Sequence, residues 1–327
     1  MHRSAHSATL NTPVLREDAL SQFNRLLAVR AASLFDFEPE TVYHYTAAAA
    51  FQAIIEQKQI RATNFSFLND PSEVQYGRRT VEEEIANIRS NADVVVADFL
   101  NRVASHLTLE RFSEVYVVSF TAAGDDLSQW RAYGTSFSDR FSIGFDAPSL
   151  YSLVGGLQNA LYARVVYGSV DQRERVNSIL RRAIEFLQQE SLLPALATPF
   201  AIATAMHLAR LLPVLKDPAY ASEQERRIVI WHAKDDPSPK IDSSRGVLRP
   251  YIPVELGDPL PIVAVNVMAP SRREAAVKAA SFFCRQMASA RSFRRTQSYR
   301  SLTSFGGLPV EAAGLPPGRP TVVPCSG

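Results

Sequence analysis

The sequence predicts an α+β fold, a single elaborated domain with a mixed or split central β-sheet flanked by helices. Segments with strand and helix periodicity are mixed along the chain without a regular β-α-β alternation, which argues against a doubly wound parallel sheet. The 327 residues are 46% hydrophobic and 21% charged, a composition that supplies a sizeable core and excludes a disordered chain. Two average domains would also fit this length, but we expect one elaborated domain.

The first half of the chain shows helical periodicity interrupted by short strands. Apolar residues at helical spacing predict a helix over 17–34. Thr46 is expected to cap the helix that follows the first strand. Thr80 and Glu83 form a capping-box pattern that predicts the start of another helix. The other expected elements of this half are strands over 41–45 and 60–63 and helices over 47–57 and 94–106.

The second half contains more strands. Residues 115–121 form a continuous β-branched and aromatic run, and residues 141–145 alternate as a strand with one buried face does. The further expected elements are strands over 162–167, 228–231 and 262–267 and helices over 171–189, 195–215 and 271–287. We therefore divide the chain into a leader and helix (1–40), an α+β domain (41–303) and a flexible tail rich in Gly and Pro (304–327).

Composition excludes several classes of protein. The net charge of +2 excludes a globally basic nucleic-acid coat, though not a local basic patch. Cys284 and Cys325 are the only cysteines, too few for a disulfide framework or a four-cysteine metal site. The most apolar stretch, Leu192 to Met206, is interrupted by prolines and is expected to be a buried helix. With no signal peptide recognisable, we expect a cytoplasmic protein, and export that needs no such signal stays open.

A first polar cluster follows the first expected strand. A histidine flanked by aromatic residues, as His44 is by Tyr43 and Tyr45, can hydrogen-bond the ribose or carboxamide of a ligand. Asn69 and Asp70 begin the loop that follows the next strand. The same residues are also explained by a histidine that only caps a helix and by a turn that Asx residues and proline favour.

A second polar cluster, Asp125 to Gly134, follows the strand 115–121. Trp130 and Tyr133 could supply a stacking platform, and Arg131 could contact a phosphate. A short amphipathic helix that packs Trp130 and Tyr133 into the core explains the pattern equally well.

A third polar cluster precedes the strand 228–231. In an extended segment Glu223, Glu225 and Arg227 share one face, because side chains alternate. An opposite charge keeps one carboxylate ionised while a like charge raises the pKa of the other, which suits acid–base chemistry. The alternative is an exposed, salt-bridged strand.

Together the three clusters resemble the DUF2971 family of mostly bacterial proteins over roughly residues 42 to 300. The resemblance rests on Tyr43-His44-Tyr45-Thr46, Phe67-Leu68-Asn69-Asp70-Pro71-Ser72-Glu73, Gln129-Trp130-Arg131-Ala132-Tyr133-Gly134, Ser142-Ile143-Gly144-Phe145-Asp146, and Lys216 with Glu223, Glu225 and Arg227. Arg131, Ala132 and Tyr220 depart from residues common in the family. The resemblance does not by itself imply an activity.

A more remote resemblance is to ADP-ribosyltransferases, whose split-sheet fold carries a His or Arg on an early strand, an aromatic residue or Ser on a middle strand and a Glu late. Here the order is His44, then Tyr133 or Ser119, then Glu225. This resemblance implies an ADP-ribosyltransferase-like fold and an NAD-dependent ADP-ribosyl or glycosyl transferase, such as an effector, a toxin or a phage-defence component. NAD would be the co-substrate, the acceptor is open, and no metal is required.

The resemblance also implies roles for individual residues. His44 would hold a ribose, and Tyr133 or Trp130 would stack on the nicotinamide. Glu225 would bond the ribose 2′-hydroxyl and stabilise an oxocarbenium-like centre, while Glu223 would activate the acceptor as a base. The remaining expected cofactor contacts are Arg131, which would meet the pyrophosphate, with Tyr45, Asn69, Asp70 and Arg227.

A non-catalytic nucleic-acid-binding module is the alternative function. Between Arg272 and Arg300 eight basic residues accompany the single acid Glu274, with Phe293 and Tyr299 interleaved. Such a segment could bind phosphates and stack on bases. A solvated helix face with a basic end explains it as well, and the segment could instead recruit the acceptor of a transferase.

Overall fold

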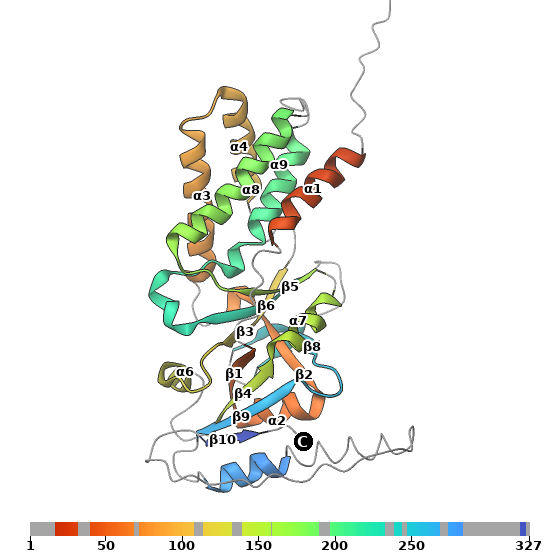
Figure 1. Cartoon of the computed structure of the whole chain (residues 1–327), viewed down its shortest axis with the longest axis vertical. Coiled ribbons are helices and arrows are strands. Elements are labelled where there is room, and N and C mark those ends of the chain that lie inside the picture. Colours follow the sequence, from red (N-terminus) through yellow and green to blue (C-terminus); the bar gives the residue numbers. More distant parts are fainter. Residues whose placement is uncertain are drawn as a thin grey trace, which may run out of the picture.

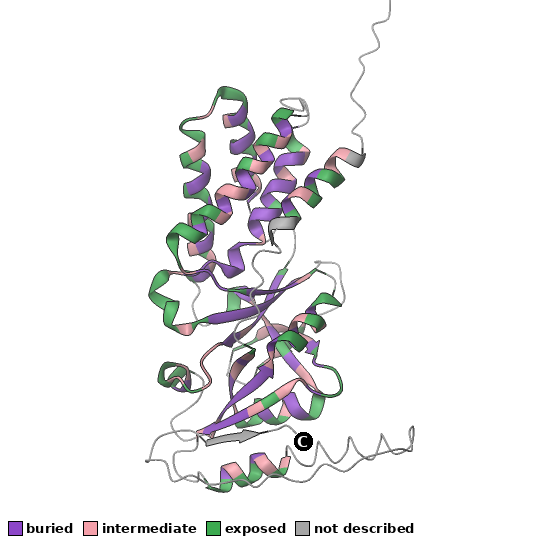
Figure 2. Ribbon diagram, viewed as in Figure 1, coloured by how far each residue is buried: buried purple, intermediate pink, exposed green. Residues whose placement is uncertain are grey.

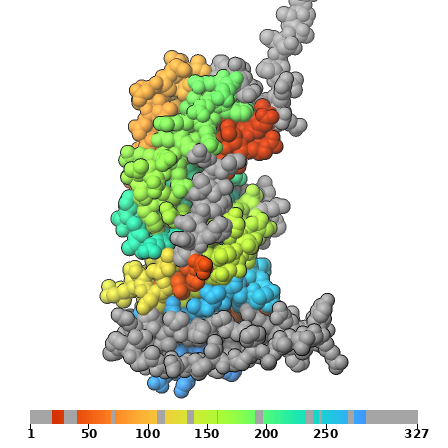
Figure 3. Space-filling view, viewed as in Figure 1, coloured from red at the N-terminus to blue at the C-terminus, as the bar shows by residue number. Residues whose placement is uncertain are grey.

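The fold is described by a computed structural model, in which a helical part lies above an antiparallel sheet (Figure 1). The described residues are 17–31, 40–68, 72–107, 114–132, 139–157, 159–189, 197–232, 239–243, 247–268, 274–283 and 321–324. Among them, no helix combines the length and apolar character needed to cross a membrane. In the space-filling view the residues of the helical part (orange and green) gather at one end of the molecule (Figure 3).

The sheet is antiparallel and forks at β3. Its strands are β1 (Thr41–Ala47), β2 (Gln59–Asn64), β3 (Glu114–Thr121), β4 (Arg140–Asp146), β5 (Ala160–Arg164), β6 (Glu225–His232), β7 (Lys240–Asp242), β8 (Arg249–Glu255), β9 (Ile262–Met268) and β10 (Thr321–Pro324). One edge of β3 pairs with β6, which pairs in turn with β5. The other edge is shared, because Thr121 pairs with β1 while Val117 pairs with β2. The expected mixture of α and β elements is therefore confirmed.

Helices pack against both faces of β3 and β6. They are α1 (Glu17–Ala31), α2 (Ala48–Gln57), α3 (Ser72–Arg89), α4 (Val94–His106), α6 (Leu127–Ala132), α7 (Ala147–Gly155), α8 (Ser169–Gln189) and α9 (Ala197–Ala209), with 3-10 turns η2 (Phe65–Phe67), η3 (Leu212–Val214) and η4 (Pro218–Glu223). A further helix spans 274–283. Helices α1, α3, α4, α8 and α9 form the helical part of the molecule (Figure 1).

Alternation along β3 and β6 builds two cores. Val117 and Val229 face the core shared with the helical part. Val118 and Ile228, the neighbouring residues, face a second core lined by α2 and α7. Because side chains alternate, each strand serves both cores, and both strands are buried along most of their length (Figure 2).

Two expected helix starts are wrong. Thr80 lies inside α3, where its Oγ1 donates to the carbonyl of Tyr76 instead of capping a helix. Thr46 belongs to β1, because pairing with β4 continues to Ala47, and Ala47 occupies the N-cap of α2 without a side-chain bond.

Several elements differ from the sequence expectation. β8 contains Pro250 and Pro253, which mask a strand in sequence because proline cannot donate to the ladder. α9 ends at Ala209, so the helix expected over 195–215 is shorter and is followed by η3. Four residues of the expected flexible tail form β10, which pairs with β9.

Candidate functional site

The site begins where β6 begins. Glu225 and Arg227 share one face of β6, as the alternation predicts, and lie opposite Thr121 and Ser119 of β3. Glu223 does not belong to the strand, contrary to expectation. It ends η4, and Gln224 then turns the chain in a left-handed conformation (φ 46°). The two glutamates therefore reach the same site from different elements.

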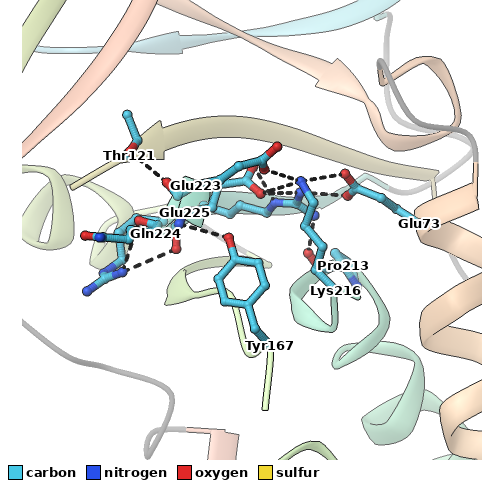
Figure 4. Close-up of polar contacts among 10 residues, drawn as sticks. Glu73, Thr121, Tyr167, Pro213, Lys216, Glu223, Gln224 and Glu225 are labelled. Carbon is cyan, nitrogen blue, oxygen red and sulfur yellow. Dashed lines mark hydrogen bonds and ion pairs between the residues drawn. The ribbon is translucent and has the colours of Figure 1, made fainter. Parts of the chain in front are cut away.

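Five charged side chains meet at this point, and we call them the charge cluster (Figure 4). Its members are Glu73 of α3, Lys216, Glu223, Glu225 and Arg227.

Arg227 holds two of the carboxylates. Its Nε donates to Oε1 of Glu225 (2.9 Å) and its Nη2 to Oε2 of Glu225 (2.7 Å), a two-pronged pairing that fixes the carboxylate plane. The same Nη2 donates to Oε2 of Glu73 (2.7 Å), and Nη1 donates to the carbonyl of Pro213 (2.7 Å). Arg227, expected to contact a cofactor, thus makes its hydrogen bonds inside the protein and positions Glu225.

Lys216 links all three carboxylates. Its Nζ lies 2.8 Å from Oε1 of Glu73, 2.5 Å from Oε2 of Glu223 and 3.1 Å from Oε2 of Glu225. Gln172 of α8 holds the backbone here, since its Nε2 donates to the carbonyl of Lys216 (2.8 Å). Three acids and two bases give the charge cluster a formal charge of −1 when all are ionised.

Burial is unequal within the charge cluster. The side chain of Glu225 is 8% exposed and that of Arg227 is 1% exposed, whereas that of Glu223 is 28% exposed. Glu223 is therefore the member of the charge cluster that solvent reaches most easily.

The two glutamates differ in pKa. Burial alone would raise the pKa of Glu225, but the charges of Arg227 and Lys216 and hydrogen bonds from Arg227 and Ser119 lower it to about 2. Burial raises the pKa of Glu223, and the charges of Glu225 and Glu73 add to this effect against the attraction of Lys216. The two pKa values differ in the predicted direction, but burial, and not the predicted like charge, is the largest cause of the raised pKa of Glu223.

Backbone contacts tie the start of β6 to its neighbours. The hydroxyl of Tyr167 accepts from the backbone N–H of Glu225 (3.0 Å), and Oγ1 of Thr121 donates to the carbonyl of Glu223 (2.7 Å). Burial raises the pKa of Tyr167, and the nearby charge of Glu225 raises it further. Tyr167 is consequently a neutral hydrogen-bonding group at physiological pH.

Ser119 lies between His44 and Glu225. Its hydroxyl hydrogen-bonds Glu225, and its carbonyl lies 3.0 Å from Nδ1 of His44, which must be the donor because a carbonyl only accepts. The His44 ring packs edge-on against Phe120 (5.9 Å between centroids), on the opposite face of the sheet from Thr121 and Glu225. His44 and Glu225 thus approach Ser119 from opposite faces of the sheet. The expectation that both side chains contact one bound substrate is therefore wrong for His44.

Tyr45 and Trp130 form an aromatic support beside the site. Tyr45 donates to the carbonyl of Ala123 (2.8 Å), and its ring lies 4.7 Å from that of Trp130. Trp130 is 1% exposed, and its Nε1 donates to Asp125 (3.0 Å). Trp130 therefore packs into the core, as the alternative interpretation of this cluster expected, whereas Arg131 lies exposed on α6.

Other expected residues fall outside the described ranges. Tyr133, Asn69 and Asp70 do so, as does the basic segment 272–300 except for the helix 274–283. Within the described ranges, no group of three His, Cys, Asp or Glu side chains is arranged to hold a metal ion.

Sequence reasoning missed two residues of this site. In the sequence, Glu73 ends the Asn-Asp-Pro-Ser-Glu run and Tyr167 ends an expected strand, and neither position indicates a contact with Glu225 or Arg227. The sequence feature that could have indicated Glu73 is the family resemblance, because the residues that carry it include Glu73 as well as Lys216, Glu225 and Arg227. Comparison with protein-family models, curated proteins and solved structures finds no match to this chain.

Proposed function

We propose that this protein is an NAD-dependent ADP-ribosyl or glycosyl transferase whose chemistry is carried out at the start of β6. The observation that carries the proposal is the charge cluster at the start of β6, in which Arg227 and Lys216 hold the Glu225 carboxylate beside the more exposed Glu223. The order histidine, serine, glutamate is the order that the resemblance to ADP-ribosyltransferases requires.

Glu225 suits the stabilisation of a cationic transition state. Breaking the bond between ribose and nicotinamide builds positive charge on the sugar. Glu225 stays ionised because its pKa is about 2, and the pairing with Arg227 orients its carboxylate before the substrate binds. The formal charge of −1 on the charge cluster leaves one negative charge uncompensated at this place.

Glu223 suits the activation of the acceptor. A base must reach the incoming nucleophile, and Glu223 is the most exposed carboxylate of the charge cluster. Its raised pKa brings it closer to neutral pH, where a general base is most effective. Lys216 contacts both glutamates and holds them side by side.

The test is nicotinamide release from NAD labelled in the nicotinamide ring. We expect the wild-type protein to release label and Glu225→Gln to lose release while keeping the fold, as followed by circular dichroism. Glu84→Gln is the matched control, because Glu84 is also buried but lies outside the charge cluster. We expect Glu223→Gln to slow transfer to an acceptor more than it slows nicotinamide release.

Two outcomes would contradict the proposal: wild-type protein that leaves NAD intact, or Glu225→Gln that releases nicotinamide at the wild-type rate. Absence of turnover together with salt-dependent nucleic-acid binding that survives Glu225→Gln would instead support the nucleic-acid-binding alternative through Arg272 to Arg300.

A further inference from the structure

A second site is suggested by a cavity between the helical part and the sheet. Its volume is about 510 Å³, within the range of small-molecule sites. Residues of α1, α8, α9, β5 and β6 line it, including Leu27, Ile179 and Trp231. The cavity is thus built from elements far apart in sequence that meet at the junction of the two parts.

Two arginines line this cavity without a carboxylate partner. Arg175 of α8 and Arg210, just beyond α9, form no ion pair or side-chain hydrogen bond among the described residues. Burial lowers the pKa of both guanidinium groups. Asp171 and Glu174 also line the cavity, and their charges raise the pKa of Arg175 against the effect of burial, but both are exposed and neither forms an ion pair with it. Two partly desolvated guanidinium groups, neither of them in an ion pair within the described residues, favour an anionic ligand.

The rest of the wall supplies an apolar surface and a few polar groups. Leu161, Ile179 and Leu211 are buried side chains of the cavity wall. The guanidinium of Arg210 lies over the ring of Trp231, 5.7 Å from its centroid, which orients the cation. His207, another lining residue, is neutral at physiological pH because burial lowers its pKa to about 4. A ligand with an apolar body and one anionic group fits this surface.

We propose that this cavity binds a small organic phosphate of nucleotide size, with Arg175 and Arg210 contacting the phosphate and the organic body lying against the apolar wall. A phosphomonoester carries close to two negative charges at neutral pH, which matches two arginines. The site is separate from the charge cluster, because Trp231 lies four residues beyond Arg227 on β6, roughly 13 Å by the rise of a strand. The proposal does not depend on the proposed transferase activity.

The chain carries its own reporter for this test. It has two tryptophans, Trp130 and Trp231, and only Trp231 lines the cavity. In a Trp130→Phe background, adenosine 5′-monophosphate is titrated to 1 mM while Trp231 fluorescence is recorded. We expect a saturable change with the nucleotide and none with adenosine over the same range. Arg175→Gln and Arg210→Gln should each weaken binding at least tenfold.

Controls separate this site from the charge cluster. Arg181→Gln, an exposed arginine on the same helix α8, should leave binding unchanged, as should Glu225→Gln. The proposal is overturned if the nucleotide causes no saturable change, if adenosine binds equally well, or if both arginine variants bind normally. Loss of binding in Glu225→Gln alone would place the nucleotide at the charge cluster and overturn it too.

Discussion

At the scale of single residues, Arg227 determines whether the charge cluster is stable. It is 1% exposed and pairs with both Glu225 and Glu73. Replacing Arg227 leaves two buried carboxylates with a single cation, Lys216, and such uncompensated buried charge costs more than the ion pair is worth. Each member of the charge cluster is therefore stabilised by ion pairs with other members, and removal of one side chain weakens the ion pairs of the others.

We predict that Arg227→Gln lowers the free energy of unfolding by about 3–5 kcal/mol, because Glu225 and Glu73 lose one of their two cations and keep only Lys216. Urea denaturation followed by circular dichroism measures this. Arg173→Gln is the control, since the Arg173 side chain is 62% exposed and should change stability by less than about 0.5 kcal/mol. Equal stability of the two variants would show that the charge cluster is not formed.

The pKa of Glu225 predicts a pH dependence of stability. Its pKa falls from 4.5 to about 2 on folding, so its contribution is present above pH 4.5 and is lost as pH falls toward 2. The loss is on the order of 3 kcal/mol. Urea denaturation at several pH values should show a shallower slope between pH 4.5 and 2 for Glu225→Gln than for wild type. Parallel slopes would contradict the assignment.

His207 must be separated from this effect. Burial lowers its pKa from 6.5 to about 4, so the unfolded chain binds the extra proton and stability falls as pH drops from 6.5 to 4. The slope in that higher range should become smaller in His207→Gln and remain in Glu225→Gln, while Glu223, whose pKa is raised, contributes a slope of the opposite sign in all variants.

Residue chemistry was partly predictable from sequence. Strand alternation suffices to place Glu225 beside Arg227, two residues away. It cannot bring in Glu73, which is 154 residues from Arg227 and reaches it only through the packing of α3. Nor can it show that His44 and Glu225 lie on opposite faces, because that depends on the register between β1, β3 and β6.

At the scale of elements, α3 is held against η3 by a close approach at Gly77. A Cβ added there would lie 2.9 Å from the carbonyl oxygen of Leu212 and 3.3 Å from its Cα, both backbone atoms that cannot move independently. Gly77 is one helical turn after Glu73, so this contact sets how far Glu73 reaches toward Arg227.

We predict that Gly77→Ala destabilises the protein by about 1–3 kcal/mol through overpacking, despite the better helix propensity of alanine. It should also slow nicotinamide release, because Glu73 is displaced from Lys216 and Arg227. Thermal unfolding and the release assay measure the two effects. Gly155→Ala in α7 is the control, since a Cβ there meets nothing within 4 Å and should not destabilise. A Gly77→Ala protein as stable and active as wild type would contradict this role of α3.

Elements with strong hydrophobic periodicity could be predicted from the sequence. Elements whose sequence contains prolines or a misplaced capping pattern could not. α4 has the expected bounds, Val94–His106, because its apolar periodicity and its N-cap residue Asp93 both indicate the same helix start. β8 was missed because Pro250 and Pro253 interrupt its pattern, although it pairs with β2 and β7. The capping-box pattern of Thr80 and Glu83 predicts a helix start at the wrong place, because α3 already begins at Ser72.

At the scale of the whole molecule, β6 connects the features that matter for function. Its first residues enter the charge cluster, its middle contributes to both cores, and Trp231 near its end lines the cavity. The mixed α and β composition could be predicted from the sequence. The fork of the sheet at β3 could not be predicted, because the sequence does not show which strands share an edge. At this fork the Ser119 carbonyl accepts a hydrogen bond from His44.

The central claim is that the Glu225 carboxylate promotes loss of nicotinamide from NAD. The most direct measurement is the rate of nicotinamide release by wild type, Glu225→Gln and Glu84→Gln at a temperature where all three are folded. We predict release by wild type and Glu84→Gln at similar rates and at least a hundredfold slower release by Glu225→Gln, as expected for loss of transition-state charge stabilisation. Equal release by Glu225→Gln and wild type, or no release by any of the three, would contradict the account.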